Sequence, residues 1–369
     1  MFRVLLVLVL AHYSICAFFD LTDVDDPLSL LWNNRPTFGK QRSECTTNTP
    51  VGLKHGVCQN PSLCMLSGGK PNGICGVLST CCTYESSCGK VTSQKVSYFQ
   101  RSNVDQNSRE CKYEVVLLNP NVCQVRLDFE HFNLAPAIER GNASRCDSDR
   151  LLIYPNIYNI PELCGNNDNQ HVYVHINQTT GTKKLVLDMI TLSNKSPSWK
   201  IKITQLECPG ILNTDDMASD FNLLAPLGAI QYHTNVNGEL KSFGYDTNRN
   251  LNSYTSNENY AIAFKRTASV CGIKFRINYF NLPDDNSTEI KDKMCTSDYL
   301  FIPYIQFLGT THDVIAKLCS NKYEKDETFV SQSPGPLTVY FKSSPNFVRA
   351  NGTGPNAFYI TYEMLTFCN

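Results

Sequence analysis

Cysteine is the residue type in this sequence with the widest chemical use. The chain has 369 residues and 17 cysteines, and 16 of them lie beyond the first 17 residues. Thiols bind metal, attack substrates as thiolates, or pair as disulfides. An even number in an exported chain is most simply explained by eight disulfides, because export brings thiols into an oxidising compartment. The choice therefore depends on whether the chain is exported.

The first 17 residues predict export. Arg3 supplies positive charge, the apolar run Val4–Leu10 follows, and small residues precede a cleavage point after Cys16 or Ala17. An anchored helix is the alternative, but the run is shorter than the ~20 residues that span a bilayer. We predict a signal peptide over residues 1–17 and a secreted, extracellular protein without a transmembrane anchor. Five glycosylation sequons agree with this compartment: Asn142, Asn177, Asn194, Asn286 and Asn351.

Residues 18–44 contain no cysteine and differ in composition from the rest. Aspartates come first, and a basic stretch from Arg35 to Arg42 follows. The segment is predicted to be disordered or propeptide-like. In the second case it is cut near Arg42, and N-terminal sequencing of the secreted protein distinguishes the two.

Six cysteines lie within residues 45–82 and predict a small disulfide-rich module. Their spacing lacks the paired C-x-x-C knuckles of zinc sites, so disulfides are favoured over zinc. So few residues cannot bury an adequate core, and crosslinks must supply much of the stability. The neighbours Cys81 and Cys82 cannot easily bond each other, so each should reach back to an earlier cysteine. Fifteen pairings of six cysteines exist.

The sequence offers little for catalysis. It contains no H-E-x-x-H, no G-x-S-x-G and no Gly-rich dinucleotide loop. His171 and His175 are four residues apart in an alternating segment. On a strand they lie ~13 Å apart, too far to share a metal ion, and we expect them to face solvent. A net charge of −1 disfavours nucleic acid as a partner. We predict no enzyme, no catalytic residue and no cofactor.

The rest of the chain contains an internal repeat. VCQVRLDFEHFNLAP parallels VCGIKFRINYFNLPD, and CDSDRLLIY parallels CTSDYLFIP. Two copies are predicted over residues 88–208 and 227–369, with residues 209–226 as the linker. The repeated cysteines have similar spacings in both copies: Cys123, Cys146, Cys164 and Cys208, then Cys271, Cys295, Cys319 and Cys368.

Apolar and polar residues alternate within both copies. Val125, Leu127 and Phe129 show this period of two in the first copy, and Ile273 and Phe275 show it in the second. The period is typical of half-buried strands. Many short strands without a helical period predict a mainly β fold with two antiparallel β-sandwiches.

Each copy resembles a CUB domain, an extracellular β-sandwich. The resemblance rests on the strand pattern, on a C-x-x-D-x-L-x-I stretch in each copy, and on Cys88 and Cys111 in the first copy. The second copy has no match for that pair. In its cysteine order the module at 45–82 resembles a clip domain, although no serine-protease domain follows it. The whole is similar to secreted arthropod CUB-domain proteins of mostly unassigned role.

The resemblance implies a disulfide pairing for all 16 cysteines. The clip pattern supplies three bonds, the CUB pattern supplies the others, and the terminal cysteine of each copy takes the partner that remains. The implied pairs are Cys45–Cys81, Cys58–Cys75, Cys64–Cys82, Cys88–Cys111, Cys123–Cys208, Cys146–Cys164, Cys271–Cys368 and Cys295–Cys319.

Calcium is the one metal that the resemblance suggests. Asp149 and Asp298 match one of the acids with which many CUB domains bind Ca²⁺. The other ligands of the family are not matched in either copy. In the second copy Asp284 and Asp285 are weak substitutes. The alternative, which we favour, is that Asp149 and Asp298 brace loops by hydrogen bonds.

Secretion, the repeat and the lack of catalytic motifs together predict a non-catalytic interaction protein that uses its CUB-like domains to bind an extracellular protein or glycan. The clip-like module suggests an alternative, a regulator or cofactor of an extracellular serine-protease cascade, with a serine protease as partner. Hydrophobic residues make up 42% of the chain and charged residues 18%, as expected of folded domains with cores.

Overall fold

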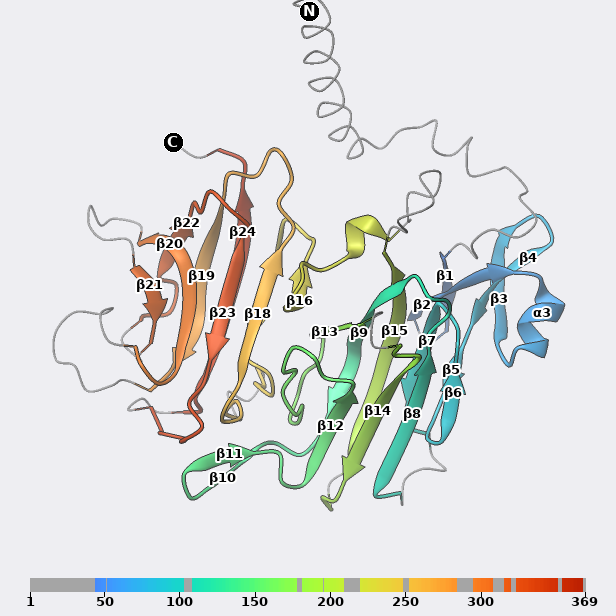
Figure 1. Ribbon diagram of the computed structural model, residues 1–369, viewed down its shortest axis with the longest axis horizontal. Coiled ribbons are helices and arrows are strands. Elements are labelled where there is room, and N and C mark those ends of the chain that lie inside the picture. The colour runs from blue at the N-terminus through green and yellow to red at the C-terminus, as the bar shows by residue number, and fades with distance from the viewer. Residues whose placement is uncertain are drawn as a thin grey trace, which may run out of the picture. The chain divides into compact units, whose positions relative to one another are not determined.

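The computed structural model describes most of the chain beyond residue 43, and Figure 1 shows its elements. The mainly β fold predicted from the alternating pattern is confirmed. Within the described part, helix is confined to α3 (Pro61–Leu66) and the 3-10 turn η4 (Phe221–Leu223), and neither helix could cross a membrane. The described ranges are 44–50, 52–102, 108–177, 181–194, 196–208, 220–247, 252–283, 295–307, 315–319, 323–350 and 354–367.

The cysteine-rich module is an antiparallel sheet with the strand order β1-β2-β4-β3, joined to the short helix α3. The Asn60 side chain accepts a hydrogen bond from Ser62 N (2.9 Å), and a proline occupies the first helical position. A Cβ at Gly56 would lie 2.3 Å from Cys82 O, so only glycine lets β2 and β4 approach so closely. The strands are β1 (Glu44–Thr49), β2 (Gly52–Gln59), β3 (Lys70–Gly76) and β4 (Ser79–Thr83).

The first sandwich follows the module and consists of two sheets. One has the order β12-β14-β8-β6 and the other β13-β9-β15-β7-β5. Alternate residues of these strands fill the space between the sheets; Phe99, for example, stacks on Tyr113 with 4.9 Å between ring centroids. The strands are β5 (Glu85–Ser86), β6 (Lys90–Thr92), β7 (Val96–Gln100), β8 (Glu110–Val116), β9 (Val122–Asn133), β12 (Asp149–Tyr154), β13 (His171–His175), β14 (Lys184–Thr191) and β15 (Ser198–Glu207), with a hairpin of β10 (Ile138–Arg140) and β11 (Ala143–Arg145).

The second sandwich has the strand order β16-β18-β23-β20-β22-β19-β24-β17, with β21 paired to β20. Strand β20 pairs with β23 through Tyr299–Phe301 and with β22 through Ile305–Phe307, so it connects the two halves of the sheet. Tyr304, between these segments, has a φ of 53°. The strands are β16 (Ala229–His233), β17 (Asn237–Lys241), β18 (Asn259–Phe264), β19 (Gly272–Asn281), β20 (Tyr299–Phe307), β21 (Ile315–Leu318), β22 (Thr328–Ser331), β23 (Thr338–Lys342) and β24 (Ala357–Leu365).

The two sandwiches share one scheme of strand pairing. Strands β6 and β8 run parallel in the first sandwich, as β16 and β18 do in the second. The long strand β9 pairs with β13 and β15, as β19 pairs with β22 and β24. Likewise β12 and β8 flank β14, as β20 and β18 flank β23. Strand β16 therefore corresponds to β6, and β22 corresponds to β13.

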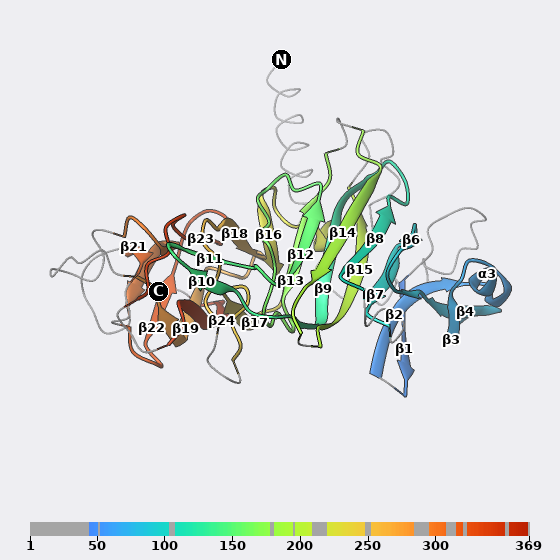
Figure 2. The ribbon, with the colours of Figure 1, turned by 90° about the horizontal axis from the view of Figure 1, so that it is seen from below.

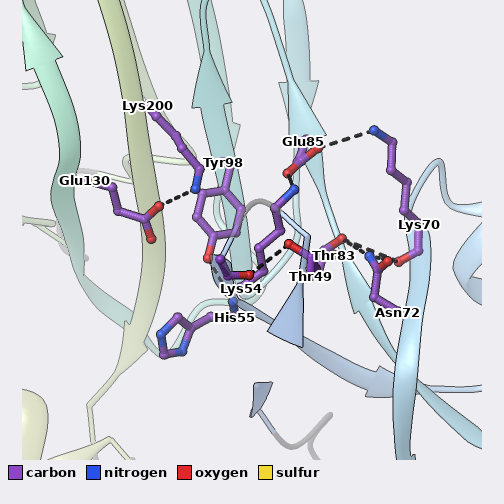
Figure 3. Close-up of polar contacts among 11 residues, drawn as sticks. Thr49, Lys54, His55, Lys70, Asn72, Thr83, Glu85, Tyr98, Glu130 and Lys200 are labelled. Atoms are coloured by element: carbon purple, nitrogen blue, oxygen red, sulfur yellow. Dashed lines mark hydrogen bonds and ion pairs between the residues drawn. The ribbon is translucent and has the colours of Figure 1, made fainter. Parts of the chain in front are cut away.

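Polar contacts hold the module against the first sandwich (Figure 3). His55 N donates to Tyr98 OH (2.8 Å), and Lys54 pairs with Glu85, which also accepts from Lys70 (3.3 Å). The ammonium of Lys200 lies 5.0 Å from the centroid of the Tyr98 ring, a cation–π distance. Burial raises the pKa of the Tyr98 hydroxyl above its ordinary range. The hydroxyl therefore stays protonated while it accepts from the module.

The described end of the predicted linker packs on the first sandwich. Lys95 Nζ lies 2.9 and 2.7 Å from the two carboxylate oxygens of Asp220, and both side chains are buried. Gln124 and Ala225 exchange two hydrogen bonds, at 2.8 and 2.9 Å. Residues 209–219 lie outside the described ranges. The residues that lead into the second sandwich are thus held against the first sandwich.

Candidate binding site

The two sandwiches meet where the edge strand β13 faces the edge strand β16, which lie side by side in Figures 1 and 2. His171 Nε2 accepts a hydrogen bond from Tyr232 N (2.9 Å), and His175 Nε2 lies 2.8 Å from Ala229 O. Tyr173 and Tyr232 belong to a small apolar cluster of their own at this junction. The two histidine side chains thus engage backbone groups on the edge of β16.

The expectation that His171 and His175 face solvent is wrong. They are 7% and 6% exposed. Val172 and Val174 point into the first sandwich, so the histidines point the other way, and there β16 covers them. Burial holds the pKa of His171 well below its ordinary value and lowers that of His175. Both rings are therefore neutral at physiological pH, and the hydrogen bond that His171 Nε2 accepts requires a neutral ring.

Two glycines allow a second close approach at the junction. Gly165 has φ +70°, and a Cβ there would lie 2.9 Å from Gly244 O in the other sandwich. Gly244 has φ +80°, and its N–H donates to Asn167 Oδ1 (2.8 Å). A side chain at either position would meet backbone, which cannot move aside as a flexible side chain can.

A cavity of about 450 Å³ opens beside this contact, and we call it the junction cleft. Strands β9, β15, β16 and β17, the start of β13, and Tyr362 of β24 form its walls. Both sandwiches therefore contribute to it. Six side chains define the cleft: Arg126, Asp128, His171, Gln231, His233 and Tyr362.

The charged side chains of the cleft are paired. Asp128 accepts from Arg126 (2.7 Å) and lies 3.4 Å from the ammonium of Lys202. On the opposite wall Lys241 lies 3.4 Å from Glu239. Burial alone would lower the pKa of Arg126, but Asp128 and the Tyr173 hydroxyl outweigh it and raise the pKa. The guanidinium is therefore charged and already engaged.

Two polar atoms on the cleft floor have no hydrogen-bond partner among the described residues: Gln231 Oε1 and His233 Nε2. Gln231 is 3% exposed, and its Nε2 donates to Gln170 Oε1 (3.2 Å). Burial, and then the charge of Arg126, lower the pKa of His233 to about 4. A neutral imidazole nitrogen and an amide oxygen are thus buried without a partner on residues that line the cavity. Unpaired buried polar atoms are uncommon, and ligand sites are one place where they occur.

The aspartates considered for calcium, Asp149 and Asp298, accept hydrogen bonds from neighbouring loops. Asp149 accepts from Ala135 N (3.1 Å), Ser193 N (2.8 Å) and Ser193 Oγ (2.6 Å). Its counterpart Asp298 accepts from Ser344 N (2.7 Å) and Tyr254 OH (2.6 Å). Asp284 and Asp285 lie outside the described ranges. No group of three or more His, Cys, Asp or Glu residues suited to a metal ion occurs in the part of the chain that the structure describes.

Seven disulfides join the cysteines in the pairs that the resemblance implies. Cys368 lies outside the described ranges, so Cys271–Cys368 stays a prediction. The seven are Cys45–Cys81, Cys58–Cys75, Cys64–Cys82, Cys88–Cys111, Cys123–Cys208, Cys146–Cys164 and Cys295–Cys319.

The structure describes three of the five asparagines predicted to be glycosylated. Asn142 and Asn194 are exposed, and Asn177 is partly exposed. Asn286 and Asn351 lie outside the described ranges. Glycosylation at all five stays a prediction.

Sequence reasoning did not find the junction cleft. Gln231 and His233 lie well before the first cysteine of the second copy, in a segment without a motif. The one available signal was the run His171–His175, in which histidine and tyrosine alternate with valine. The pattern does not reveal what would cover its polar side.

Residues 226–365 match the protein-family model described as the animal CUB domain. The match shows a CUB domain over the second sandwich. CUB domains are typically non-catalytic modules that mediate extracellular interactions, and the many disulfides fit an extracellular protein. No curated protein sequence matches the chain.

Two solved structures are similar to the chain at low level. The human "CUB1-EGF-CUB2 domain" of MASP-1/3 has 13% identity and a TM-score of 0.26, covering 74% of this chain and 100% of that one. The full extracellular region of zebrafish Gpr126/Adgrg6 has 11% identity and a TM-score of 0.25, covering 74% of this chain and 36% of that one.

Proposed function

We propose that the protein is a secreted, non-catalytic binding protein that uses its CUB-like sandwiches to bind an extracellular protein or glycan. The observation that carries this proposal is the junction cleft, because residues of both sandwiches line one cavity. Its volume of about 450 Å³ falls within the ~300–1,000 Å³ of small-ligand sites. The CUB match over residues 226–365 supports an extracellular interaction role.

The domain organisation is proposed with it. Residues 1–17 are the signal peptide, 18–44 a disordered or propeptide-like segment, and 45–82 a clip-like module. Residues 88–208 and 227–369 are two CUB-like domains joined by residues 209–226. The shared pairing scheme of the two sandwiches and the matching bonds Cys146–Cys164 and Cys295–Cys319 support a second CUB-like domain.

One carboxyl group in the second sandwich has a pKa in the range of a catalytic acid. Burial raises the pKa of Glu258 to about 7. Its Oε1 accepts from Thr255 N (2.9 Å) and Thr255 Oγ1 (2.6 Å), which makes it the brace of a turn. It does not line the junction cleft, where the acids are ion-paired. This arrangement supports binding rather than catalysis.

The test is a pull-down from the native extracellular fluid with tagged, glycosylated full chain, with and without EDTA, read by mass spectrometry. Asn237→Trp adds bulk at the exposed rim of the cleft. Asn346→Trp adds the same bulk at an exposed position of the second sandwich that does not line the cleft. We expect a partner that Asn346→Trp retains and Asn237→Trp loses. Recovery of no partner, or equal recovery by both variants, would contradict the proposal.

A specific feature of the module favours the alternative, regulation of an extracellular serine protease. The β3–β4 hairpin exposes Ile74 on β3 and Val77 and Leu78 in its turn, at 91%, 93% and 84%. Leu78 has φ 57°, a conformation costly for a leucine. An apolar side chain in a strained, exposed turn contributes little to folding, which suits a docking surface.

This alternative has its own measurement. Full chain and a Val77→Ser variant are added to serine-protease zymogens purified from the same fluid, and binding and activation rate are followed. Val91→Ser, another exposed valine outside the module, is the control. Loss of the effect in Val77→Ser alone supports the alternative, and the absence of any effect of the unmodified chain removes it.

A further inference from the structure

Strand β17 forms one edge of the sheet in the second sandwich and lies beside β24 in Figure 2. Among the described residues no strand pairs with its other side. Met364 N donates to Val236 O (2.7 Å), and Ser242 N donates to Phe358 O (3.0 Å). Bonded pairs alternate along an antiparallel ladder, so the even-numbered residues of β17 bond to β24. The main-chain groups of the odd-numbered residues point to the open side: Asn237, Glu239 and Lys241.

The junction cleft runs past these three residues, which all line it. Asn237 and Glu239 are exposed, so a molecule that enters the cleft from solvent meets this strand. The outward main-chain groups recur at every second residue, about 6.7 Å apart. An extended peptide has the same repeat and offers donors and acceptors in the same alternation. The edge therefore matches a strand more closely than a ligand without that repeat.

The first sandwich shows how such an edge is completed. Its strand β7 pairs with β15, which corresponds to β24, so β7 corresponds to β17. The outer side of β7 is covered by β5, which runs parallel to it. Tyr98 N on β7 donates to Tyr84 O (2.7 Å), just before β5. In the first copy an extended segment of the chain itself thus takes the place that is open beside β17.

The strand registers identify the residue of β17 that corresponds to Tyr98. Across two neighbouring strands Tyr98 lies in line with Asp128, and Glu239 lies in line with Arg276. Asp128 and Arg276 hold the same place in the repeated segments VCQVRLDFEHFNLAP and VCGIKFRINYFNLPD. The N–H of Glu239 is therefore the counterpart of the Tyr98 N–H, and an added strand would offer it a carbonyl as Tyr84 does.

The segment that could cover β17 from within the chain is engaged elsewhere. Strand β5 begins five residues before β6, and five residues before β16 lies Leu224. Leu224 and Ala225 pack on the first sandwich, where they join the apolar cluster of Tyr173. Ala225 N also donates to Gln124 Oε1 of that sandwich (2.9 Å). The second copy therefore lacks the covering segment that the first copy has.

The size of the cleft and the length of β17 favour a single peptide strand over a second copy of the protein. At the ~30 Å³ that one water occupies, the cavity holds about 15 water-sized groups, which is enough for the main chain of about four residues. A whole sandwich does not fit there. Strand β17 is also short and carries Glu239 and Lys241, and short charged edges discourage pairing between two sheets.

We propose that the open edge of β17 is a docking site for an extended, polar peptide segment of an extracellular protein, which adds to the sheet as β5 adds to β7. This proposal rests on the proposed function and names the class of partner. The main chain of β17 supplies most of the affinity, as in other cases of strand addition. The charges on the cleft walls, of both signs, favour polar side chains on the added strand.

The test pans a phage-displayed library of random, unconstrained ten-residue peptides on the immobilised full chain and measures the enriched peptides, once synthesised, by calorimetry. Glu239→Pro removes an outward N–H without removing a bond to β24, and edge strands tolerate proline at such positions. Asn237→Pro, at the first residue of β17, is a second blocking variant. Tyr359→Phe is the control, because it breaks the bond from Tyr359 OH to Glu239 (2.8 Å) that Glu239→Pro also breaks, and Tyr359 does not line the cleft.

We expect an enriched peptide whose affinity falls about 10-fold or more in both proline variants and is nearly unchanged in Tyr359→Phe. Melting temperatures equal to that of the unmodified chain show that the variants are folded. In the unmodified chain, hydrogen exchange resolved by residue gives a measurement that needs no variant. The peptide should protect the outward amides of Asn237, Glu239 and Lys241 and leave those of Gly238 and Leu240 unchanged, since these already bond to β24.

Several results overturn the proposal. They are the enrichment of no peptide, full binding by both proline variants, an equal loss in Tyr359→Phe, and protection that does not alternate along β17. A dimer of the unmodified chain that Glu239→Pro abolishes would assign the edge to a second copy instead. A pull-down partner that Asn237→Trp loses and Glu239→Pro retains overturns this inference while the proposed function stands. If the pull-down recovers no partner at all, the proposed function fails as well.

Discussion

Acidification should weaken the contact between the two sandwiches, and the contribution of His233 to this loss can be worked out. Its ring stacks on Phe264 (5.4 Å) and lies edge-on to Tyr362 and to His171. Arg126 is the charged group with the largest effect on the pKa of His233. Its positive charge opposes protonation of the His233 ring. The ordinary pKa of 6.5 applies when the junction opens or the chain unfolds, whereas the closed junction lowers the pKa to about 4.

The sign depends on where the proton binds. Below pH 6.5 the open or unfolded state takes up a proton that the closed state refuses, so stability is complete above that pH and falls as the pH drops toward 4. At 1.36 kcal/mol per pH unit, His233 contributes a loss of about 2 kcal/mol between pH 7 and pH 5. His171 and His175 act in the same direction, because burial lowers the pKa of both.

Urea unfolding of the full chain at pH 7 and pH 5 measures this loss. His233→Phe keeps a ring on Phe264 and removes the titrating group. Between pH 7 and pH 5 the free energy of unfolding of this variant should therefore fall by about 2 kcal/mol less than that of the unmodified chain. Tyr362→Phe, which removes the hydroxyl bonded to Asn235 O (3.3 Å), should lower stability equally at both pH values. If His233→Phe loses as much stability on acidification as the unmodified chain, the reasoning about His233 is refuted.

Three further perturbations test the contacts that hold the fold. Lys95→Met leaves Asp220 buried without its cation and should cost about 3–5 kcal/mol in urea unfolding, most of it recovered by adding Asp220→Asn; no recovery would contradict the ion pair. Replacing Cys88 and Cys111 together by alanine should cost about 2–4 kcal/mol, seen as a lower melting temperature, and an unchanged value would show that the bond restrains nothing. Asp149→Asn should cost about 1–3 kcal/mol through weakened hydrogen bonds, whereas EDTA should leave the melting temperature of the unmodified chain unchanged; a clear fall with EDTA would instead assign the carboxylate to calcium.

The sandwich strands could be predicted from the sequence because the alternation of apolar and polar residues can be read within one short segment. Leu127 and Phe129 on β9, and Ile273 and Phe275 on β19, are buried on alternate positions as the period of two predicts. The alternation depends only on the geometry of one strand.

The junction could not be predicted in the same way. Strand β13 also alternates, but its second face is buried by β16, about 60 residues further along the chain. Whether His171 faces water or a second sandwich depends on the packing of two folded units. The bond between Lys95 and Asp220 is similar, since 125 residues separate its partners. Nothing in the charge pattern near either residue marks it as half of a buried pair.

The two sandwiches contact each other through strands that do not correspond in the two copies. The contact joins β13 of the first to β16 of the second, and β16 corresponds to β6, not to β13. Two copies that meet through unlike faces leave one face of each kind unused, whereas a twofold pair uses the same face twice. On the second sandwich the strand that corresponds to β13 is β22, and β22 is paired on its other side with β20. The second copy therefore offers no open edge equivalent to that of β13, and a further copy would need a different interface.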